Sequence, residues 1–255
     1  MKVRILGCGT STGVPKIGNE WGQCDPKEPR NYRLRTSILV TSAGERMLVD
    51  CGPDLRQQLL AAEVNRLDGV IVTHAHGDHC HGIDELRPVS QAISGPVPLY
   101  ARRDVLDELK LRFAYAFDQS DFYRPVCEAR DLEDLLKFGH AQVRFVDQPH
   151  GQPTTLGMRF DEGSKSIGYA IDFSGLSGDM AELYQGVDVW IADCLTRKPH
   201  PTHMHLDGVL GFARDLGVGQ LYLVHMGNGL DYRELVAELP DWAAPAYDGL
   251  EIDVE

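Results

Sequence analysis

The chain has 255 residues, of which 43% are hydrophobic and 25% charged, and its formal net charge is −13. It is long enough to bury a sizeable core, and its negative charge disfavours general binding to nucleic-acid backbones or anionic membranes. No stretch approaches the roughly 20 apolar residues of a membrane span, and residues 1–7 lack the apolar region of a secretory signal.

The first predicted element is a strand in which Val3 and Ile5 alternate with Lys2 and Arg4. It leads into a glycine-rich segment at 7–13. This segment lacks the Gly-Lys-[Ser/Thr] ending of a nucleotide P-loop and the glycine spacing of a dinucleotide site. We therefore interpret it as a tight turn near the active site.

The remaining elements predict a layered α/β protein that forms one domain over residues 1–255. Two strand-like runs, 37–40 and 46–49, flank Ala43 and Gly44, which is typical of a hairpin. Further strands are predicted at 69–72, 142–146, 156–160, 166–171, 187–192 and 221–224, and helices at 53–63, 104–113 and 207–216. No linker or internal repeat interrupts this order.

The most informative motif is Thr-His-Ala-His-Gly-Asp-His at residues 73–79, directly after a predicted buried strand. Imidazole nitrogens and carboxylate oxygens are ligands of Zn²⁺ and similar divalent ions. In a turn, His74 and His76 can converge on one ion, while Asp78 and His79 can reach a second. A solvated histidine-rich loop is the alternative, but it does not explain why the cluster ends a buried strand.

Three more candidate ligands follow later apolar runs, namely His150, Asp172 and His225. Each alone is more often a turn or capping residue than a ligand. Functional side chains gather on the loops at strand ends, however, and together with the first motif these residues give a set of seven.

This ordered set resembles the metallo-β-lactamase superfamily, whose signature is His-x-His-x-Asp-His followed by separate His, Asp and His ligands. The resemblance implies a four-layered αβ/βα sandwich with the metals at one edge between its two sheets. It also implies that one ion is held by His74, His76 and His150 and a second by Asp78, His79 and His225, with Asp172 bridging them.

Two divalent ions about 3.5–4 Å apart can share and deprotonate a water, so this ligand set predicts hydrolysis through a metal-bridging hydroxide. We expect two ions per chain, Zn²⁺ or Mn²⁺, with Fe²⁺ as a further alternative. We predict Asp78 and His203 as catalytic residues. His203 resembles the substrate-binding, proton-donating histidine of the superfamily's phosphodiesterase branches, and His205 is the runner-up, with helix capping as its alternative role.

Three further residues have two open interpretations each. Arg87 could reach a substrate phosphate, although a helix-end salt bridge is the better reading. Asp50 and Asp193 end predicted strands. They either orient the metal-bound histidines from behind or simply terminate the strands through turn hydrogen bonds.

The stretches at 6–15, 33–37 and 50–54 resemble the subgroup that contains the phosphoribosyl 1,2-cyclic phosphate phosphodiesterases. This subgroup commonly has a structural zinc site with three cysteines and one histidine. The matching positions here are Asn19, Trp21, Cys24 and Asn228. One thiolate cannot hold a closed tetrahedral zinc, so we predict no structural zinc and a loop held by packing around Trp21.

The predicted function is hydrolysis of small cyclic or nucleotide-like phosphodiesters. A tRNA 3′-processing endonuclease is the first alternative, which the acidic charge disfavours; a thioester or lactone hydrolase and a non-enzymatic metal-binding protein follow. We expect a small phosphodiester substrate, no nucleic-acid or membrane partner, and leave a homodimer open. The six scattered cysteines form no CxxC pair, which favours reduced thiols and a cytoplasmic location.

Overall fold

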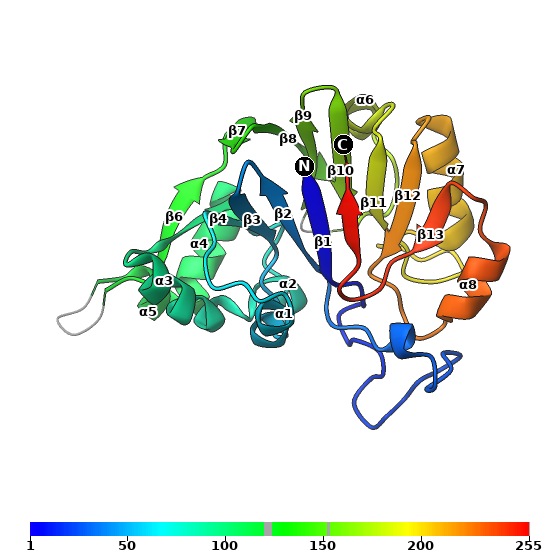
Figure 1. Cartoon of the computed structure of the whole chain (residues 1–255), viewed down its shortest axis with the longest axis horizontal. Coiled ribbons are helices and arrows are strands. Elements are labelled where there is room, and N and C mark those ends of the chain that lie inside the picture. The colour runs from blue at the N-terminus through cyan, green and yellow to red at the C-terminus, as the bar shows by residue number, and fades with distance from the viewer. Residues whose placement is uncertain (120–123, 152–153, 255) are drawn as a thin grey trace.

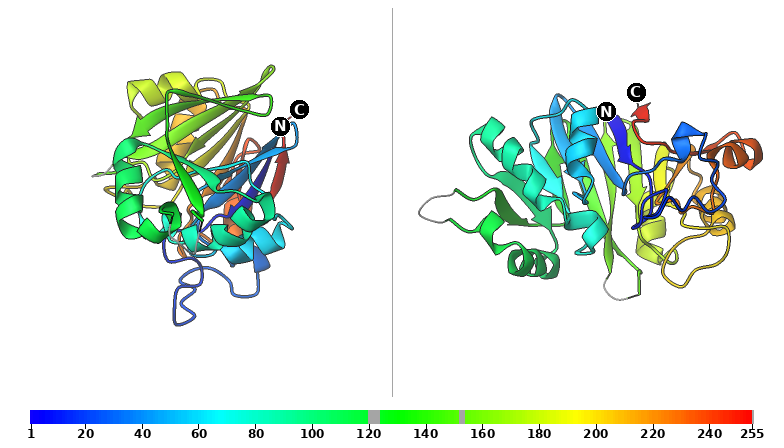
Figure 2. Two further views of the ribbon diagram at one scale, coloured as in Figure 1. Left: turned by 90° about the vertical axis from the view of Figure 1, so that its left-hand side faces the viewer. Right: turned by 90° about the horizontal axis from the view of Figure 1, so that it is seen from below.

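The computed structural model describes residues 1–119, 124–151 and 154–254, and in these residues two seven-stranded sheets stack face to face. Helices cover the outer face of each sheet, as the three views of Figures 1 and 2 show. This arrangement confirms the four-layered sandwich that the resemblance implies. The two chain ends lie side by side, because the first and last strands are neighbours (Figure 1).

The first sheet contains mostly the N-terminal half of the chain. Its strands, in spatial order, are β14 (Glu251–Asp253), β1 (Lys2–Gly7), β2 (Ser37–Ser42), β3 (Glu45–Val49), β4 (Gly69–Ile71), β5 (Val97–Ala101) and β6 (Cys127–Asp131). Strands β14 to β3 pair antiparallel, and β3 to β6 pair parallel.

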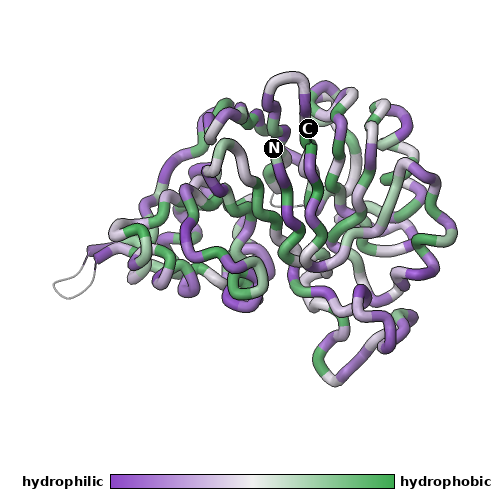
Figure 3. Tube along the Cα trace, in the orientation of Figure 1, coloured by the Kyte–Doolittle hydropathy of each residue, from purple (hydrophilic) through white to green (hydrophobic). Residues whose placement is uncertain are grey.

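Two local predictions in this sheet are confirmed. In β1, Val3 and Ile5 are buried while Lys2 and Arg4 are partly exposed, and Figure 3 shows the alternating hydropathy of this strand. The hairpin between β2 and β3 turns at Ala43 and Gly44, whose φ angles are 50° and 86°. Two consecutive positive φ angles define the type I′ turn that matches the twist of paired strands.

The second sheet has a similar mixed pairing. Its strands, in spatial order, are β13 (Ala243–Pro245), β12 (Gln220–Val224), β11 (Val189–Asp193), β10 (Lys165–Ala170), β9 (Thr155–Glu162), β8 (Ala141–Gln148) and β7 (Leu135–Phe138). Strands β7 to β10 pair antiparallel, and β10 to β13 pair parallel. The five strands predicted after residue 140 are therefore present with shifted ends.

The three predicted helices correspond to α1 (Leu55–Ala61), α4 (Arg103–Arg112) and α7 (Leu206–Asp215). Helix α1 is shorter than predicted at both ends, since Asp54 is its N-cap and Ala62 its C-cap. Sequence periodicity did not identify the short helices, which are α2 (Gly77–Cys80), α3 (Arg87–Ile93), α5 (Ala114–Phe117), α6 (Gly178–Tyr184) and α8 (Tyr232–Glu238), with 3₁₀ turns η1 (Pro29–Asn31) and η2 (Ile83–Leu86). Helices of one or two turns contain too few residues for a 3.6-residue repeat.

Two apolar cores hold these layers together. One lies between the sheets and continues under α6 and α7, with Ile5, Phe160 and Trp190 among its buried residues. The other packs α1, α3 and α4 onto the first sheet around Leu48 and Leu99. All six cysteines are buried and free. Among the described residues, no helix combines the length and apolar character that crossing a bilayer requires.

Candidate metal centre

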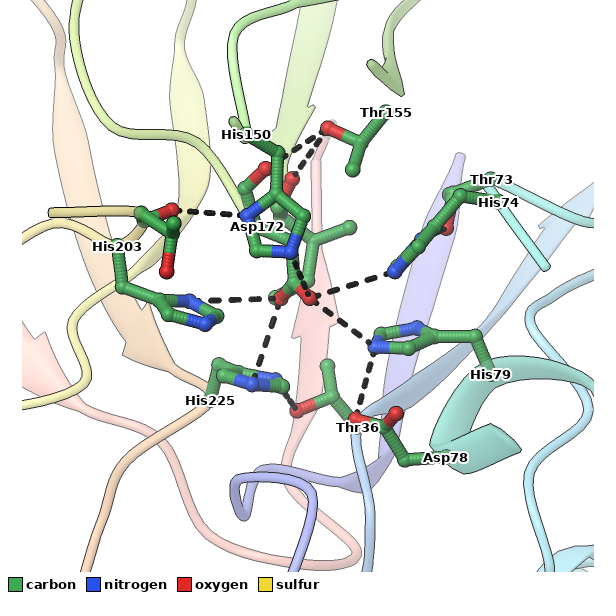
Figure 4. Close-up of polar contacts among 12 residues, drawn as sticks. Thr36, Thr73, His74, Asp78, His79, His150, Thr155, Asp172, His203 and His225 are labelled. Carbon is green, nitrogen blue, oxygen red and sulfur yellow. Dashed lines mark hydrogen bonds and ion pairs between the residues drawn. The ribbon is translucent and has the colours of Figure 1, made fainter. Parts of the chain in front are cut away.

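The seven predicted ligands lie close to the ends of strands from both sheets and converge on one point. Figure 4 shows six of them, all except His76. His74 and His76 lie in the turn after β4, and Asp78 and His79 lie in α2. The other three, His150, Asp172 and His225, follow β8, β10 and β12.

The backbone at this edge is strained. Asp50, Asp172 and His225 have φ angles of 63°, 50° and 56°, in the left-handed region. This conformation costs a side-chain-bearing residue about 1–2 kcal/mol, so surrounding contacts must enforce it. At His225, for example, the next residue along the chain, Met226, is fixed through its N–H, which donates to the Cys8 carbonyl at 2.9 Å. The fold thus holds these side chains in directions that relaxed strand ends would not give.

Asp172 is the centre of the cluster. Its Oδ2 lies 3.5 Å from the Nε2 atoms of both His74 and His79 and 3.6 Å from that of His150. Its Oδ1 lies 3.4 Å from Nε2 of His225. Oδ2 therefore lies near imidazoles of both predicted ion sites, and Oδ1 lies near the imidazole of His225.

The seven predicted ligands form two groups, in each of which the ligand atoms lie within 4.8 Å of one another, and Asp172 forms a third such group with Asp193 and His203. The first is His74, His76, His150 and Asp172, and the second is Asp78, His79, Asp172 and His225. Nε2 of His74, Nε2 of His79 and Oδ1 of Asp172 are buried without a hydrogen-bond partner. Ligand atoms that share a tetrahedral ion at 2.0–2.2 Å are about 3.3–3.6 Å apart, so both the spacing and the unpartnered atoms fit divalent ions.

Two threonines fix the ring orientation of two of these histidines. Thr73 Oγ1 donates to Asp50 Oδ2, and it lies 3.0 Å from Nδ1 of His74. Because its proton is already used, this hydroxyl accepts from the ring N–H. By the same argument Thr36, which donates to the Gly9 carbonyl, accepts from Nδ1 of His225 at 3.2 Å. Both rings then direct the Nε2 lone pair into the centre.

Pure acceptors fix two more rings. Nδ1 of His79 donates to Asp50 Oδ2 at 2.7 Å, and Nδ1 of His150 donates to the Thr202 carbonyl at 2.8 Å. Asp50 therefore contacts a histidine of the cluster, and its role in orienting a metal ligand stays a prediction. The threonine partners were not predicted, although Thr73 belongs to the motif and Thr36 to the stretch at 33–37.

The loop that carries Asp50 packs directly on α2. The Cys51 N–H donates to the His79 carbonyl at 2.8 Å, and the Gly82 N–H donates to the Cys51 carbonyl at 2.8 Å. A Cβ at Gly52 would overlap the carbonyl oxygen of Asp78. Glycine at this position thus allows the two backbones to meet and sets the distance between Asp50 and His79.

The electrostatics of the cluster favour cations. Burial lowers the pKa of His74 and His150, which keeps these rings neutral, as ligands must be. Burial would also lower the pKa of His79, but the carboxylates of Asp50, Asp78 and Asp172 outweigh it and raise this pKa. The carboxylates around His79 therefore favour positive charge in this part of the cluster.

His203 stands beside this cluster and faces the same cavity. Its Nδ1 donates to Asp193 Oδ2 at 2.9 Å, and its ring stacks on that of His225 with centroids 5.2 Å apart. Burial works to lower its pKa, but the hydrogen bond and the negative charge of Asp193 raise it overall. Asp193 thus supports His203, not one of the seven predicted ligands, which departs from its first interpretation.

A cavity of about 290 Å³ opens onto the centre. It is lined by Ser11, His76, Asp78, His150, Gly151, Asp172, Thr202, His203 and His225. Ser11 belongs to the glycine-rich segment at 7–13, so this segment is a tight turn beside the site, as predicted.

Two predicted substrate-binding residues lie elsewhere. His205 occupies the position before α7 and is absent from the cavity lining. Its placement agrees with the alternative of a residue at the start of a helix, although its side chain makes no capping hydrogen bond. Arg87 begins α3 and lines a different cavity with Ser90 and Gln91. Both residues are close in sequence to a metal motif or a ligand strand, and for Arg87 a place at the end of a helix is the better interpretation from the sequence.

A buried polar network holds the loop where the subgroup has its structural zinc. Asp231 accepts hydrogen bonds from Asn31 Nδ2 at 2.6 Å and from the Asp25 N–H at 2.9 Å. Arg33 donates to the carbonyls of Gly227 and Leu230 at 3.1 and 2.6 Å.

The four positions that match the zinc ligands contribute little to this network. Cys24 Sγ lies 3.5 Å from the Leu230 carbonyl, and Asn228 contacts the Glu20 carbonyl. Asn19 is exposed. The Trp21 ring packs 6.4 Å from Tyr32, so aromatic packing contributes, as predicted, but the buried hydrogen bonds span more of the loop.

The fold and the site together define a hydrolase of the metallo-β-lactamase fold. A profile described as the Beta-lactamase superfamily domain matches residues 45–226, and the chain belongs to this superfamily. Within it, the chain resembles a solved diphosphatase of the PhnP family, with 33% identity, a TM-score of 0.90, and coverage of 98% of this chain and 96% of that one.

Two curated relatives also match. An octanoyltransferase of Porphyromonas gingivalis is 30% identical over 261 residues. The match covers 100% of this chain and 52% of the relative. A ribonuclease Z of Archaeoglobus fulgidus is 31% identical over 177 residues, which cover 67% of this chain and 48% of the relative. The matched regions thus span about half the length of these relatives. Human tRNase Z, short form, shares the fold, with a TM-score of 0.73 and 18% identity.

Proposed function

We propose that the chain is a phosphodiesterase that uses two divalent ions to hydrolyse small cyclic or nucleotide-like phosphodiesters. The observation that carries this proposal is the position of the His203–Asp193 pair on the same cavity as both ligand groups. A pair of ions alone suits many hydrolases. Here His203 lines the cavity and is held by the buried carboxylate of Asp193, which adds a positioned proton donor for an alkoxide leaving group.

The ligand roles follow from the two groups. His74, His76 and His150 would hold one ion, and Asp78, His79 and His225 the other, with Asp172 shared. Zn²⁺ or Mn²⁺ suits this nitrogen-rich set, and Fe²⁺ is the further alternative. When bound, such a pair supplies an activated water at neutral pH and neutralises phosphoryl oxygens.

His203 would complete the reaction on the leaving group. Its Nδ1–H is committed to Asp193, so the remaining ring nitrogen, Nε2, is the one that can exchange a proton with substrate. The hydrogen bond and the negative charge of Asp193 raise the pKa of His203, which favours the protonated ring. As the bond from phosphorus to the water oxygen forms and the bond to the leaving oxygen breaks, that oxygen takes the Nε2 proton.

A second candidate is hydrolysis of a diphosphate bond, which the similarity to the PhnP-family diphosphatase supports. The attacked phosphorus and the ions would be the same, but the leaving group would be a phosphate. The ribonuclease Z relatives keep a tRNA endonuclease as a further alternative, although the net charge of −13 works against binding a polyanion.

The experiment is a substrate panel on the metal-loaded chain. With Zn²⁺ or Mn²⁺ it should hydrolyse bis(p-nitrophenyl) phosphate, and no turnover with either metal would refute the proposal. Ribose 1,2-cyclic phosphate, 2′,3′-cyclic nucleotides, a diphosphate diester and a tRNA precursor then separate the candidates by kcat/KM. Preference for the diphosphate diester would select the second candidate.

A further inference from the structure

The turn at residues 10–13 brings unused hydrogen-bond donors to the rim of the cavity. Ser11 lines the cavity together with Asp78 and His203. The Gly13 N–H donates to the Thr10 carbonyl at 2.8 Å and closes the turn. Within the described part of the chain, the N–H groups of Ser11 and Thr12 donate to no protein acceptor. Successive free N–H groups in a turn form a concavity that suits anions.

We propose that this turn binds an anionic phosphoryl oxygen of the substrate through the N–H and hydroxyl of Ser11. The inference rests on the proposed function, since it assigns a binding role at the same site. Neutral donors are useful here because the chain carries a charge of −13 and the cavity is lined by Asp78 and Asp172. Neutral donors at the rim can hold a negative oxygen of the substrate that is not bound to the ions.

The turn is fixed relative to the metal ligands. The Thr10 N–H donates to the carbonyl of Met226, the residue after His225, at 3.3 Å. The Gly9 carbonyl accepts the hydroxyl proton of Thr36, whose oxygen contacts Nδ1 of His225. A ligand held by Ser11 would thus be placed against His225 by a short path of hydrogen bonds, which is what precise orientation requires.

Arg35 adds positive charge next to the turn. A Cβ built at Gly13 would lie 3.6 Å from Nη1 of Arg35, so the guanidinium borders the turn. Arg35 pairs with Asp54 through Nε at 3.0 Å. Its two terminal nitrogens have no hydrogen-bond partner among the residues that the structure describes. They remain available to donate to a phosphate oxygen bound beside the turn.

Two substitutions of Ser11 separate the contribution of its hydroxyl from that of its N–H. Ser11→Ala removes the hydroxyl and keeps the N–H, whereas Ser11→Pro removes both. Proline is favoured at the second position of such a turn, and neither Ser11 nor Thr12 has a positive φ, so Ser11→Pro keeps the turn closed. Thr12→Ala is the matched control, because Thr12 is exposed and does not line the cavity.

For the substrate that the wild-type chain hydrolyses, we expect KM to rise about 3–10-fold in Ser11→Ala and about 10–100-fold in Ser11→Pro. The value of kcat should stay within about threefold, because the phosphoryl charge is present before the reaction as well as during it. Thr12→Ala should change KM less than about twofold. Zinc content and Tm, measured for every variant, should match the wild type.

Binding of inorganic phosphate to the zinc-loaded chain, measured by calorimetry, tests the turn without any turnover. Weaker phosphate binding in Ser11→Pro supports the turn even if no substrate is hydrolysed, in which case the proposed function fails alone. If the wild type is active and Ser11→Pro leaves both KM and phosphate affinity unchanged, the turn inference is wrong. Loss of zinc from folded Ser11→Pro would also overturn it, since the turn would then act on the metals.

Discussion

The buried polar cluster around Asp231 and the one around Asp172 differ in their hydrogen bonding. Around Asp231, the carboxylate oxygens and the amide of Asn31 are all paired. Around Asp172, two imidazole nitrogens and a carboxylate oxygen have no hydrogen-bond partner. Buried polar atoms are costly to leave unpaired, so a convergent group of unpaired lone pairs indicates a missing ligand, whereas a paired group indicates structure.

Whether unpaired atoms converge on one point distinguishes the two clusters as much as the number of unpaired atoms. Arg33 Nε in the Asp231 cluster also lacks a partner, but it is a single donor. In the Asp172 cluster, the two carboxylate oxygens lie 3.4–3.6 Å from the Nε2 atoms of four histidines, which is longer than ordinary hydrogen bonds and suits ligands of a shared cation. The same kinds of residue therefore form a ligand site in one place and a structural tie in the other.

The largest effect should come from Asp172→Ala, which removes the carboxylate shared by both ligand groups. We expect metal affinity and activity to fall by more than the roughly 10–100-fold that is typical of losing an outer-shell partner. Metal analysis after dialysis and hydrolysis of bis(p-nitrophenyl) phosphate measure this. Full activity with normal metal content would show that the unpaired atoms do not mark the metal site.

The next effect concerns the histidine beside the cluster. His203→Ala should retain its metals and lose about 10²–10⁴-fold in kcat for a diester with an alkoxide leaving group. His205→Ala is the matched control, since that residue is two positions away but absent from the cavity lining, and its activity should equal that of the wild type. Loss of metal from His203→Ala would instead identify His203 as a ligand.

The smallest effect on catalysis should come from the paired cluster. Asp231→Ala removes a helix-capping acceptor and two side-chain-mediated ties, so we expect the free energy of unfolding to fall by about 3 kcal/mol. Metal content and kcat of the folded chain should not change. Urea unfolding measures the loss, with the exposed Asp241→Ala as control. A fall in kcat without loss of stability would contradict this structural role.

The same variant gives a pH test with a definite sign. Burial would raise the pKa of Asp231. The hydrogen bonds that its carboxylate accepts from backbone N–H groups and from the Asn31 side chain outweigh burial and lower this pKa. A lowered pKa in the folded state stabilises the protein above the unfolded pKa, about 3.9, and this stability is lost as pH falls through the folded pKa. The stability gap between wild type and Asp231→Ala should therefore be smaller at pH 3 than at pH 7.

Sequence reasoning predicted which residues converge where each of them lies in a motif or directly follows a predicted strand. His225 directly follows β12, and His150 follows β8 after one residue. The motif at 73–79 is recognisable from its three histidines and one aspartate. Sequence reasoning failed where the fold, and not a sequence motif, brings the partners together. Asp193 pairs with His203 because β11 and the loop before α7 meet in space, and the Asp231 network joins residues some 200 positions apart. Neither has a local periodicity or spacing that could reveal it.

The central claim is that the unpaired atoms around Asp172 belong to two ion sites that share this carboxylate. The most direct measurement is anomalous diffraction from crystals of the zinc-loaded chain. We predict two peaks on opposite sides of Asp172, one beside His74, His76 and His150 and the other beside Asp78, His79 and His225. A single peak, or two peaks that do not share Asp172, would contradict the account.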